Sequence, residues 1–144
     1  MKFAKLVHVA TIAALFTACL APQNATMVGV DARSWNKRAS IIVENNDTVT
    51  LRNLNIAIRY NEKMKEVALP LKVTVLTPDS CRFEEVIELP LHHPTTALAV
   101  ATTESLPYRS QTLLNRRGNY IFSFEPLREI SGLEAIGIEF KGIE

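Results

Sequence analysis

The chain has 144 residues, and its 16 Lys and Arg residues balance 15 Asp and Glu residues to a formal net charge of +1. Apolar residues make up 47% of the sequence and charged residues 22%, which is the profile of one folded domain. This balance excludes a polybasic nucleic-acid binder and an intrinsically disordered chain, so we expect no nucleic-acid partner. Two cysteines also exclude a small fold built on disulfides.

The first residues have the pattern of a targeting segment. Lys2 and Lys5 form a basic head, an apolar stretch runs from Leu6 to Phe16, and the small residues Thr17 and Ala18 follow. This pattern predicts a signal peptide over residues 1–18. The apolar stretch is shorter than the roughly 20 residues that a membrane-spanning helix needs, which disfavours a retained membrane helix.

The residues at the expected cleavage point suggest a more specific class. The segment Phe16-Thr17-Ala18-Cys19 resembles the lipobox of bacterial lipoproteins, although Leu15 stands four places before Cys19 instead of three. The resemblance implies that Cys19 receives a diacylglycerol on its sulfur and an acyl chain on its new amino group. Several acyl chains give a near-permanent membrane anchor. The alternative is an ordinary secretory signal with Cys19 there by chance.

The residues after the expected anchor contain few periodic apolar positions. Residues 19–34 include Pro22, Asn24 and Gly29, and we interpret them as a loose tether between the lipid and the domain. The folded domain is therefore predicted to span residues 35–144.

From Trp35 onward, apolar and polar residues alternate with the period of a β-strand. The segment 48–60 alternates in two registers, which predicts a bulge or break near Arg52 and Asn53. The segments 61–68 and 127–131 are each long enough for one helical turn only. The predicted strands are 40–44, 48–60, 69–75, 83–89, 97–103, 111–116, 120–124 and 133–140.

Seven or eight short strands separated by turn signals favour an all-β fold, namely an antiparallel β-sandwich of the jelly-roll or immunoglobulin-like kind. A small closed barrel is the alternative.

Several segments resemble one family of envelope proteins. Trp35, residues 46–48, residues 56–61 and residues 71–79 occur in an order similar to that of the gliding-motility lipoprotein GldH family of Bacteroidetes, and the closing segments 118–125 and 132–139 match better. The chain departs from the family at Leu91 to Thr103, which replace a stretch rich in Gly and Trp. The resemblance implies a lipid-anchored envelope protein, linked in gliding species to the motility and secretion apparatus, with no catalytic residues to carry over.

The side chains capable of catalysis or metal binding do not form a recognisable motif. His92 and His93 are adjacent, so on a strand they would point to opposite faces, and Cys81 is a lone thiol in a predicted turn. Glu84 and Glu88 would share a strand face, which we interpret as solvated. We therefore expect no enzyme activity, no metal and no cofactor.

Three polar aromatic residues are the candidate ligand contacts. Trp35, Tyr60 and Tyr108 would allow stacking on a sugar ring if their side chains were exposed, and would be core residues otherwise. The basic pair Arg116 and Arg117, expected at a hairpin tip, would contact solvent or anionic headgroups near the anchor.

The sequence therefore favours a non-enzymatic lipoprotein of the bacterial cell envelope. We expect it to be anchored to the inner or outer membrane through Cys19, to face the periplasm, and to dock on an envelope protein through a sheet face or an edge strand. The alternative function is a membrane-tethered module that binds a glycan or another ligand.

Overall fold

A computed structural model describes residues 24–93 and 100–143, and the regular elements in this part of the chain are all β-strands. These residues include no helix with the length and hydropathy needed to cross a bilayer. The eight strands are β1 (Ala25–Gly29), β2 (Ala39–Asn45), β3 (Arg52–Asn61), β4 (Ala68–Leu76), β5 (Arg82–Pro90), β6 (Ala101–Thr112), β7 (Gly118–Pro126) and β8 (Leu133–Lys141).

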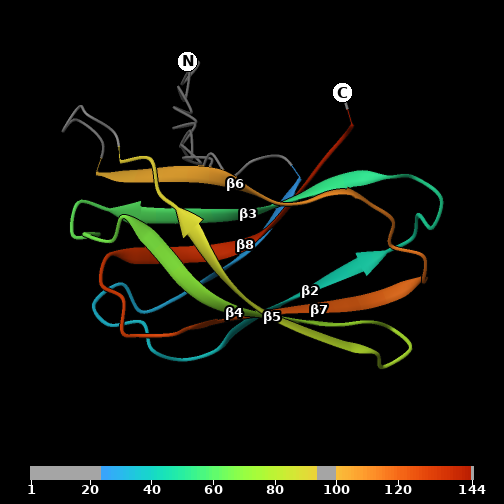
Figure 1. Cartoon of the computed structure of the whole chain (residues 1–144), viewed down its shortest axis with the longest axis horizontal. Helices are drawn as coiled ribbons and strands as arrows, with labels where there is room; N and C mark the ends of the chain where they lie inside the picture. Colours follow the sequence, from blue (N-terminus) through green and yellow to red (C-terminus); the bar gives the residue numbers. More distant parts are fainter. Residues whose placement is uncertain (1–23, 94–99, 144) are drawn as a thin grey trace, which may run out of the picture.

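The strands form two four-stranded antiparallel sheets packed face to face (Figure 1). One sheet has the order β1-β8-β3-β6 and the other the order β2-β7-β4-β5. Every pairing within these sheets is antiparallel, and β1 pairs with β8, β2 with β7, β3 with β6 and β4 with β5. This nested pairing is that of one long hairpin rolled into two layers, which makes the sandwich a jelly roll. The predicted antiparallel β-sandwich is therefore confirmed.

The core lies between the two sheets and is built from alternate residues of their inner faces. On β3, Ile56 and Ile58 are fully buried, and on β7 the rings of Phe122 and Phe124 pack between the layers. The alternation seen in the sequence therefore marks the buried face correctly, because successive strand residues point to opposite sides of a sheet.

The strand β6 differs from the prediction. Two short strands were expected at 97–103 and 111–116, whereas β6 is one strand of 12 residues, Ala101–Thr112, and residues 94–99 lie outside the described part. As an edge strand with polar residues and Pro107 in its middle, it lacks the alternation that marks a buried strand.

The predicted irregularity near Arg52 is confirmed, because the β3–β6 register shifts between Arg52 and Leu54 and again between Leu54 and Asn55.

The predicted tether is wrong from residue 25 onward. Ala25–Gly29 form β1, whose five residues pair in register with residues 135–139 of β8. The side chains of Val28 and Val30 pack against the core. The sequence signal for this strand is the alternation of Val28 and Val30. Two alternating residues are too few to distinguish a strand from a loop when glycine and polar residues surround them. The fold therefore begins ten residues before the expected boundary at Trp35.

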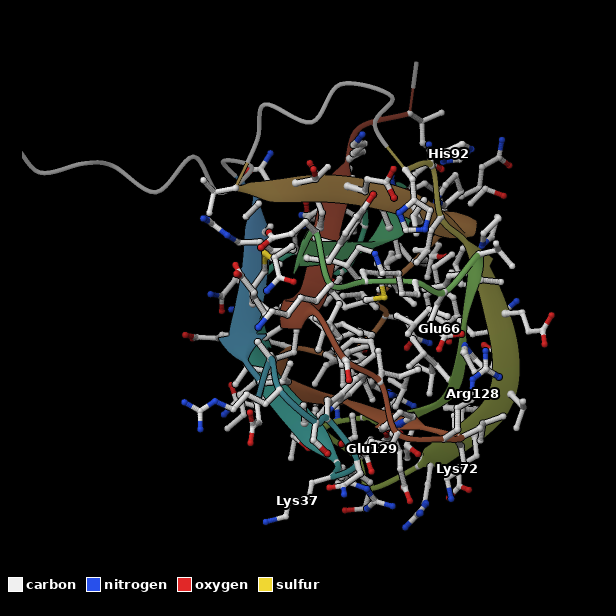
Figure 2. The ribbon with its side chains drawn as sticks, turned by 90° about the vertical axis from the view of Figure 1, so that its left-hand side faces the viewer. Lys37, Glu66, Lys72, His92, Arg128 and Glu129 are labelled. Carbon is white, nitrogen blue, oxygen red and sulfur yellow. The ribbon has the colours of Figure 1, made fainter. Side chains whose placement is uncertain are left out.

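The connections gather at two ends of the sandwich. The near end consists of Asn24, the loops 46–51, 77–81 and 113–117, and the C-terminal residues 141–143. Its loops are tied together, since the Asn45 amide donates to the Leu114 and Arg116 carbonyls at 2.9 and 2.8 Å. The far end includes the loops 30–38, 62–67 and 127–132, in which Figure 2 labels Lys37, Glu66, Arg128 and Glu129. Arg128 forms an ion pair with Glu66.

Gly137 allows β1 to approach β8. A Cβ at this position would lie 1.9 Å from the Thr26 carbonyl oxygen and 2.6 Å from the Met27 Cα, so no side chain fits without moving β1. We predict that Gly137→Ala lowers the free energy of unfolding by about 2 kcal/mol, the usual cost of overpacking. The matched control is Gly142→Ala, because a Cβ there meets nothing within 4 Å. Denaturant unfolding measures both variants, and equal midpoints would show that β1 does not pack as described.

Candidate functional site

An apolar groove lies at the side where the edge strands β5 and β6 face each other across the two sheets. We call this depression the groove. Its volume is about 360 Å³. It is lined by Leu54, Val75, Thr77, Phe83, Glu85, Tyr108, Arg109, Thr112, Leu113, Leu114, Asn115, Tyr120 and Phe122.

The pairing of β3 with β6 shifts register twice, and these shifts shape the side of the groove that β6 forms. The residues Leu54 and Asn55 of β3 are consecutive, but their partners on β6 are Arg109 and Pro107, so Tyr108 is an extra residue. Such a bulge bends the strand and redirects the side chain of the inserted residue. As a result Arg109 lies opposite the buried Leu54 and reaches the space between the sheets.

Side chains link β6 to β5 across the groove. The Tyr108 hydroxyl donates to Glu85 Oε1 at 2.5 Å, and Arg109 pairs with the same carboxylate oxygen. The Arg109 guanidinium also lies 5.1 Å from the centre of the Tyr108 ring. Burial, followed by the hydrogen bond to Glu85, raises the pKa of Tyr108 above its ordinary value of 10. Tyr108 is therefore a fixed, neutral hydrogen-bond donor in the wall of the groove.

The outer rim of the groove is apolar and exposed. Phe83 of β5 has 62% of its surface exposed although it points toward the inner side of its sheet, opposite Val75. Leu113 is exposed on the other rim. Exposed large apolar side chains around a concavity are a common mark of an interaction site.

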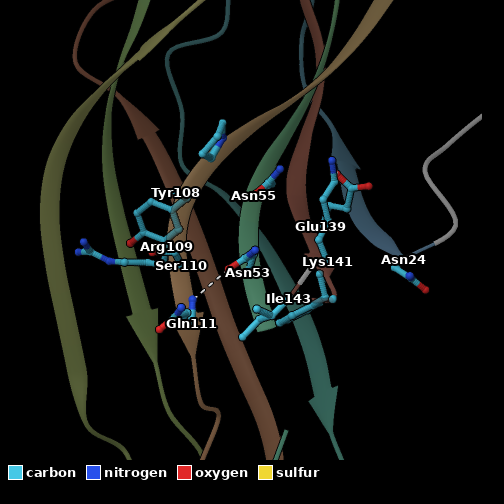
Figure 3. A pocket seen from close by; sticks show the side chains of 13 residues that line it. Asn24, Asn53, Asn55, Tyr108, Arg109, Ser110, Gln111, Glu139, Lys141 and Ile143 are labelled. Carbon is cyan, nitrogen blue, oxygen red and sulfur yellow. Dashed lines mark hydrogen bonds and ion pairs between the residues drawn. The ribbon is translucent and has the colours of Figure 1, made fainter. Parts of the chain in front are cut away.

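A second, polar depression lies on the outer face of the sheet that contains β3, β6 and β8 (Figure 3). We call it the trough. It has a volume of about 1190 Å³. It is lined by Asn24, Asn53, Asn55, Pro107, Tyr108, Arg109, Ser110, Gln111, Glu139, Phe140, Lys141, Gly142 and Ile143.

Two features stand out at the trough. One is the strained backbone of Gln111, and the other is a series of hydrogen-bonded polar side chains that ends at Glu139. Gln111 has a positive φ of 49°, unusual for a residue other than glycine, and its N–H donates to the Asn53 side-chain oxygen at 3.0 Å. In the series of polar side chains, the Asn55 amide donates to the Ser105 hydroxyl at 2.9 Å, and this hydroxyl donates to the buried carboxylate of Glu139. Lys141 Nζ lies 3.9 Å from the same carboxylate. The arrangement offers amides and one carboxylate, groups that hydrogen-bond to hydroxyls.

The three predicted ligand contacts do not come together. Trp35 is 3% exposed and Tyr60 is 2% exposed, so neither ring presents a face on which a sugar would stack. Trp35 forms an isolated bridge with Ile130, and the Tyr60 hydroxyl donates to the His92 carbonyl at 3.2 Å. Both residues are part of the core, and we no longer consider them ligand contacts. Tyr108 lines both the groove and the trough.

The remaining candidates lie elsewhere on the surface. His93 Nε2 lies 2.6 Å from the Glu66 carbonyl oxygen, and Cys81 is exposed in the turn between β4 and β5. Within residues 24–93 and 100–143, no three side chains of His, Cys, Asp or Glu gather as metal ligands. Arg116 pairs with Asp79 at 3.3 Å. Cys19, the predicted lipidation residue, lies outside the described residues.

Sequence reasoning missed most of the residues that line the two depressions. Phe83 was assigned to a strand, and its exposure follows from the position of β5 at a sheet edge. Glu139 of β8 is far in the chain from Asn53 and Asn55 of β3, and these residues meet only through the pairing of β3 with β8. The one available signal was the break in alternation at Asn53, next to the bulged part of β6.

The chain matches no model of a known protein family, and it has no significant match among curated proteins. The resemblance to the GldH family therefore stays a prediction. What the protein does has to follow from its own residues and their geometry.

The Tyr108–Glu85 contact predicts a pH dependence. A group whose pKa is higher in the folded state than in the unfolded state contributes stability that is lost as the pH rises above its unfolded value, here about 10. Tyr108→Phe cannot ionise, so we expect its free energy of unfolding to fall less steeply above pH 10 than that of the parent protein. Denaturant unfolding below and above this pH measures the difference. Parallel declines in the two proteins would contradict the assignment.

Proposed function

We propose that this protein is a non-enzymatic lipoprotein of the bacterial cell envelope that holds a jelly-roll domain at a membrane and docks on an envelope protein through the groove. The observation that carries the proposal is the position of Cys19. It follows an apolar stretch and two small residues, and it stands shortly before the first strand at Ala25. Lipid chains on this cysteine would anchor the domain with no further membrane segment.

The proposed anchor explains the order of segments along the chain. A basic head and an apolar stretch of 11 residues, Leu6 to Phe16, direct export, and the folded domain starts soon after the cleavage point. A hydrophobic core is sufficient to fold an exported domain of this size, and Cys81, the one cysteine within residues 24–93 and 100–143, has a free, exposed thiol. Anchoring on the periplasmic side of either membrane fits this order. The resemblance to the GldH family supports the same placement.

The groove supports docking on a protein. Its floor is formed by buried residues such as Leu54 and Phe122, and its rim exposes Phe83 and Leu113. The occupant that fits is a protein segment with an apolar side chain for the floor and a backbone N–H or a basic group for Glu85. We propose that this segment belongs to an envelope protein, which in related gliding species would be part of the motility and secretion apparatus.

The trough favours a second candidate, a membrane-tethered module that binds a glycan. Its side-chain amides at Asn53 and Asn55 and the carboxylate of Glu139 match the hydroxyl groups of a sugar. Of the residues first predicted to contact such a ligand, Tyr108 still borders the depression. The Tyr108 hydroxyl donates to Glu85 and the Arg109 guanidinium lies over its ring, so the aromatic stacking typical of sugar sites has weaker support than docking through the groove.

The anchor is tested by Cys19→Ala. We expect the variant to leave the membrane fraction, or to stay uncleaved, because no sulfur is available for the lipid. Fractionation together with intact mass separates these outcomes. An unchanged mass and unchanged membrane association would contradict lipidation at Cys19.

Docking is tested by placing a photo-crosslinking residue at Phe83 in native membranes. The matched control is Ile42, which is 61% exposed against 62% for Phe83 but lies on the outer face of the same sheet, on β2 opposite Ile121. We expect a single protein adduct at position 83 that is lost with Leu113→Asp, and none at position 42.

A third crosslinking position, Gln111 in the trough, separates the two candidate functions. A glycan adduct at position 111 with no protein adduct at position 83 would favour the second candidate. Equal protein adducts at positions 83 and 42 would show that the groove is not the docking surface.

A further inference from the structure

We propose that the near end of the sandwich rests on the lipid surface that holds Cys19, so that the domain has one fixed orientation on the membrane. This inference rests on the proposed lipid anchor and adds to it the face of the domain that meets the bilayer. The starting point is β1, which brings the first described residue, Asn24, within five residues of Cys19.

The covalent length of the chain limits where the domain can lie. Five residues span at most about 18 Å even when fully extended, at about 3.6 Å per residue. The ten residues of β3 run from the near end to the far end and cover about 33 Å, at about 3.3 Å per residue. An anchor on Cys19 would therefore keep the near end close to the headgroups. The far end lies farther from Asn24 than the connecting residues can span, so it would contact the membrane only if the domain were inverted.

The near end exposes apolar side chains that a lipid surface would cover. Val49, in the loop between β2 and β3, is 84% exposed, and Leu51 of the same loop and Ile143 near the C-terminus are exposed as well. The loop is held in shape by Asp47, whose Oδ1 accepts the N–H groups of Val49 and Thr50, both at 3.1 Å. Val49 is thus presented outward on a fixed turn.

Two cations, each with a carboxylate beside it, also lie next to the anchor. Asn24 shares a depression of about 470 Å³ with Arg52 and Lys141, so these two cations lie beside the point where the chain enters the fold. Each has an acidic neighbour, since Arg52 pairs with Asp47 at 2.8 Å and Lys141 lies 3.9 Å from Glu139.

The loop 113–117 adds a further basic pair to the near end, Arg116 and Arg117. Arg116 pairs with Asp79 in the neighbouring loop. Apolar side chains flanked by cations match the boundary between acyl chains and anionic headgroups.

The orientation is tested with the full lipidated chain in vesicles of phosphatidylethanolamine and phosphatidylglycerol that carry a spin label on the headgroup. The exposed thiol is first removed with Cys81→Ser, and a polarity-sensitive fluorophore is attached after Val49→Cys or, as the matched control, Val67→Cys. Val67 is 80% exposed in the loop 62–67 at the far end, so the two positions differ in place and hardly in exposure.

We expect the fluorophore at position 49 to shift to the blue and to be quenched several-fold more than the fluorophore at position 67. Equal quenching, or stronger quenching at position 67, would overturn the proposed orientation while leaving the lipid anchor intact. Intact mass of the same preparation shows whether Cys19 carries lipid. A chain without lipid would overturn the anchor and, with it, this inference.

Discussion

The backbone pairing between β1 and β8 is the interaction on which the account depends. The five residues of β1 complete the nested pairing of the jelly roll as its outermost pair, and they cover the edge that β8 would otherwise expose. The close approach is possible because Gly137 has no side chain at the point where Thr26 and Met27 pass over it. This pairing turns a segment that would have been a long spacer into part of the fold. The proposed lipid on Cys19 would thereby lie within five residues of the first described residue, Asn24.

The same nested topology explains why the groove lies where it does. On one side of the sandwich the edge strands β1 and β2 are in contact, and on the other side β5 and β6 are linked by the side chains of Tyr108, Arg109 and Glu85. Because side chains rather than backbone connect this second side, space remains between the sheets beside Phe83. The bulges in β6 then place Tyr108 and Arg109 at the opening. The proposed docking surface therefore lies at the side of the sandwich where the bulges interrupt the regular pairing of β6.

The fold was predictable from the sequence to the extent that strands bury one face. The strands β2, β4, β5, β7 and β8 were found within one or two residues of their ends, because alternation directly reports burial. The strand β6 was not, because it is an edge strand interrupted by Pro107, and its charged residues Glu104 and Arg109 stand opposite buried residues of β3, where an apolar residue would be expected. The break in alternation before Leu54 was visible, but its consequence for Tyr108 depends on which strand pairs with β3.

The candidate site was less predictable than the fold. Trp35, Tyr60 and Tyr108 have the same chemistry in the sequence, but Tyr108 lines the groove whereas Trp35 and Tyr60 are buried. A sequence shows which aromatic residues are present but does not show which of them a loop or a second sheet covers. Phe83, with an ordinary core pattern, is exposed because no strand lies beyond β5 in its sheet.

Hydrogen exchange of the β1 amides in the full lipidated protein tests the central claim most directly, because protection there requires the pairing with β8. We expect the amides of residues 25–29 that are hydrogen-bonded to β8 to exchange as slowly as their counterparts in residues 135–139. Exchange at the rate of an unstructured peptide would show that β1 does not belong to the fold, and the short connection to the membrane would be lost with it.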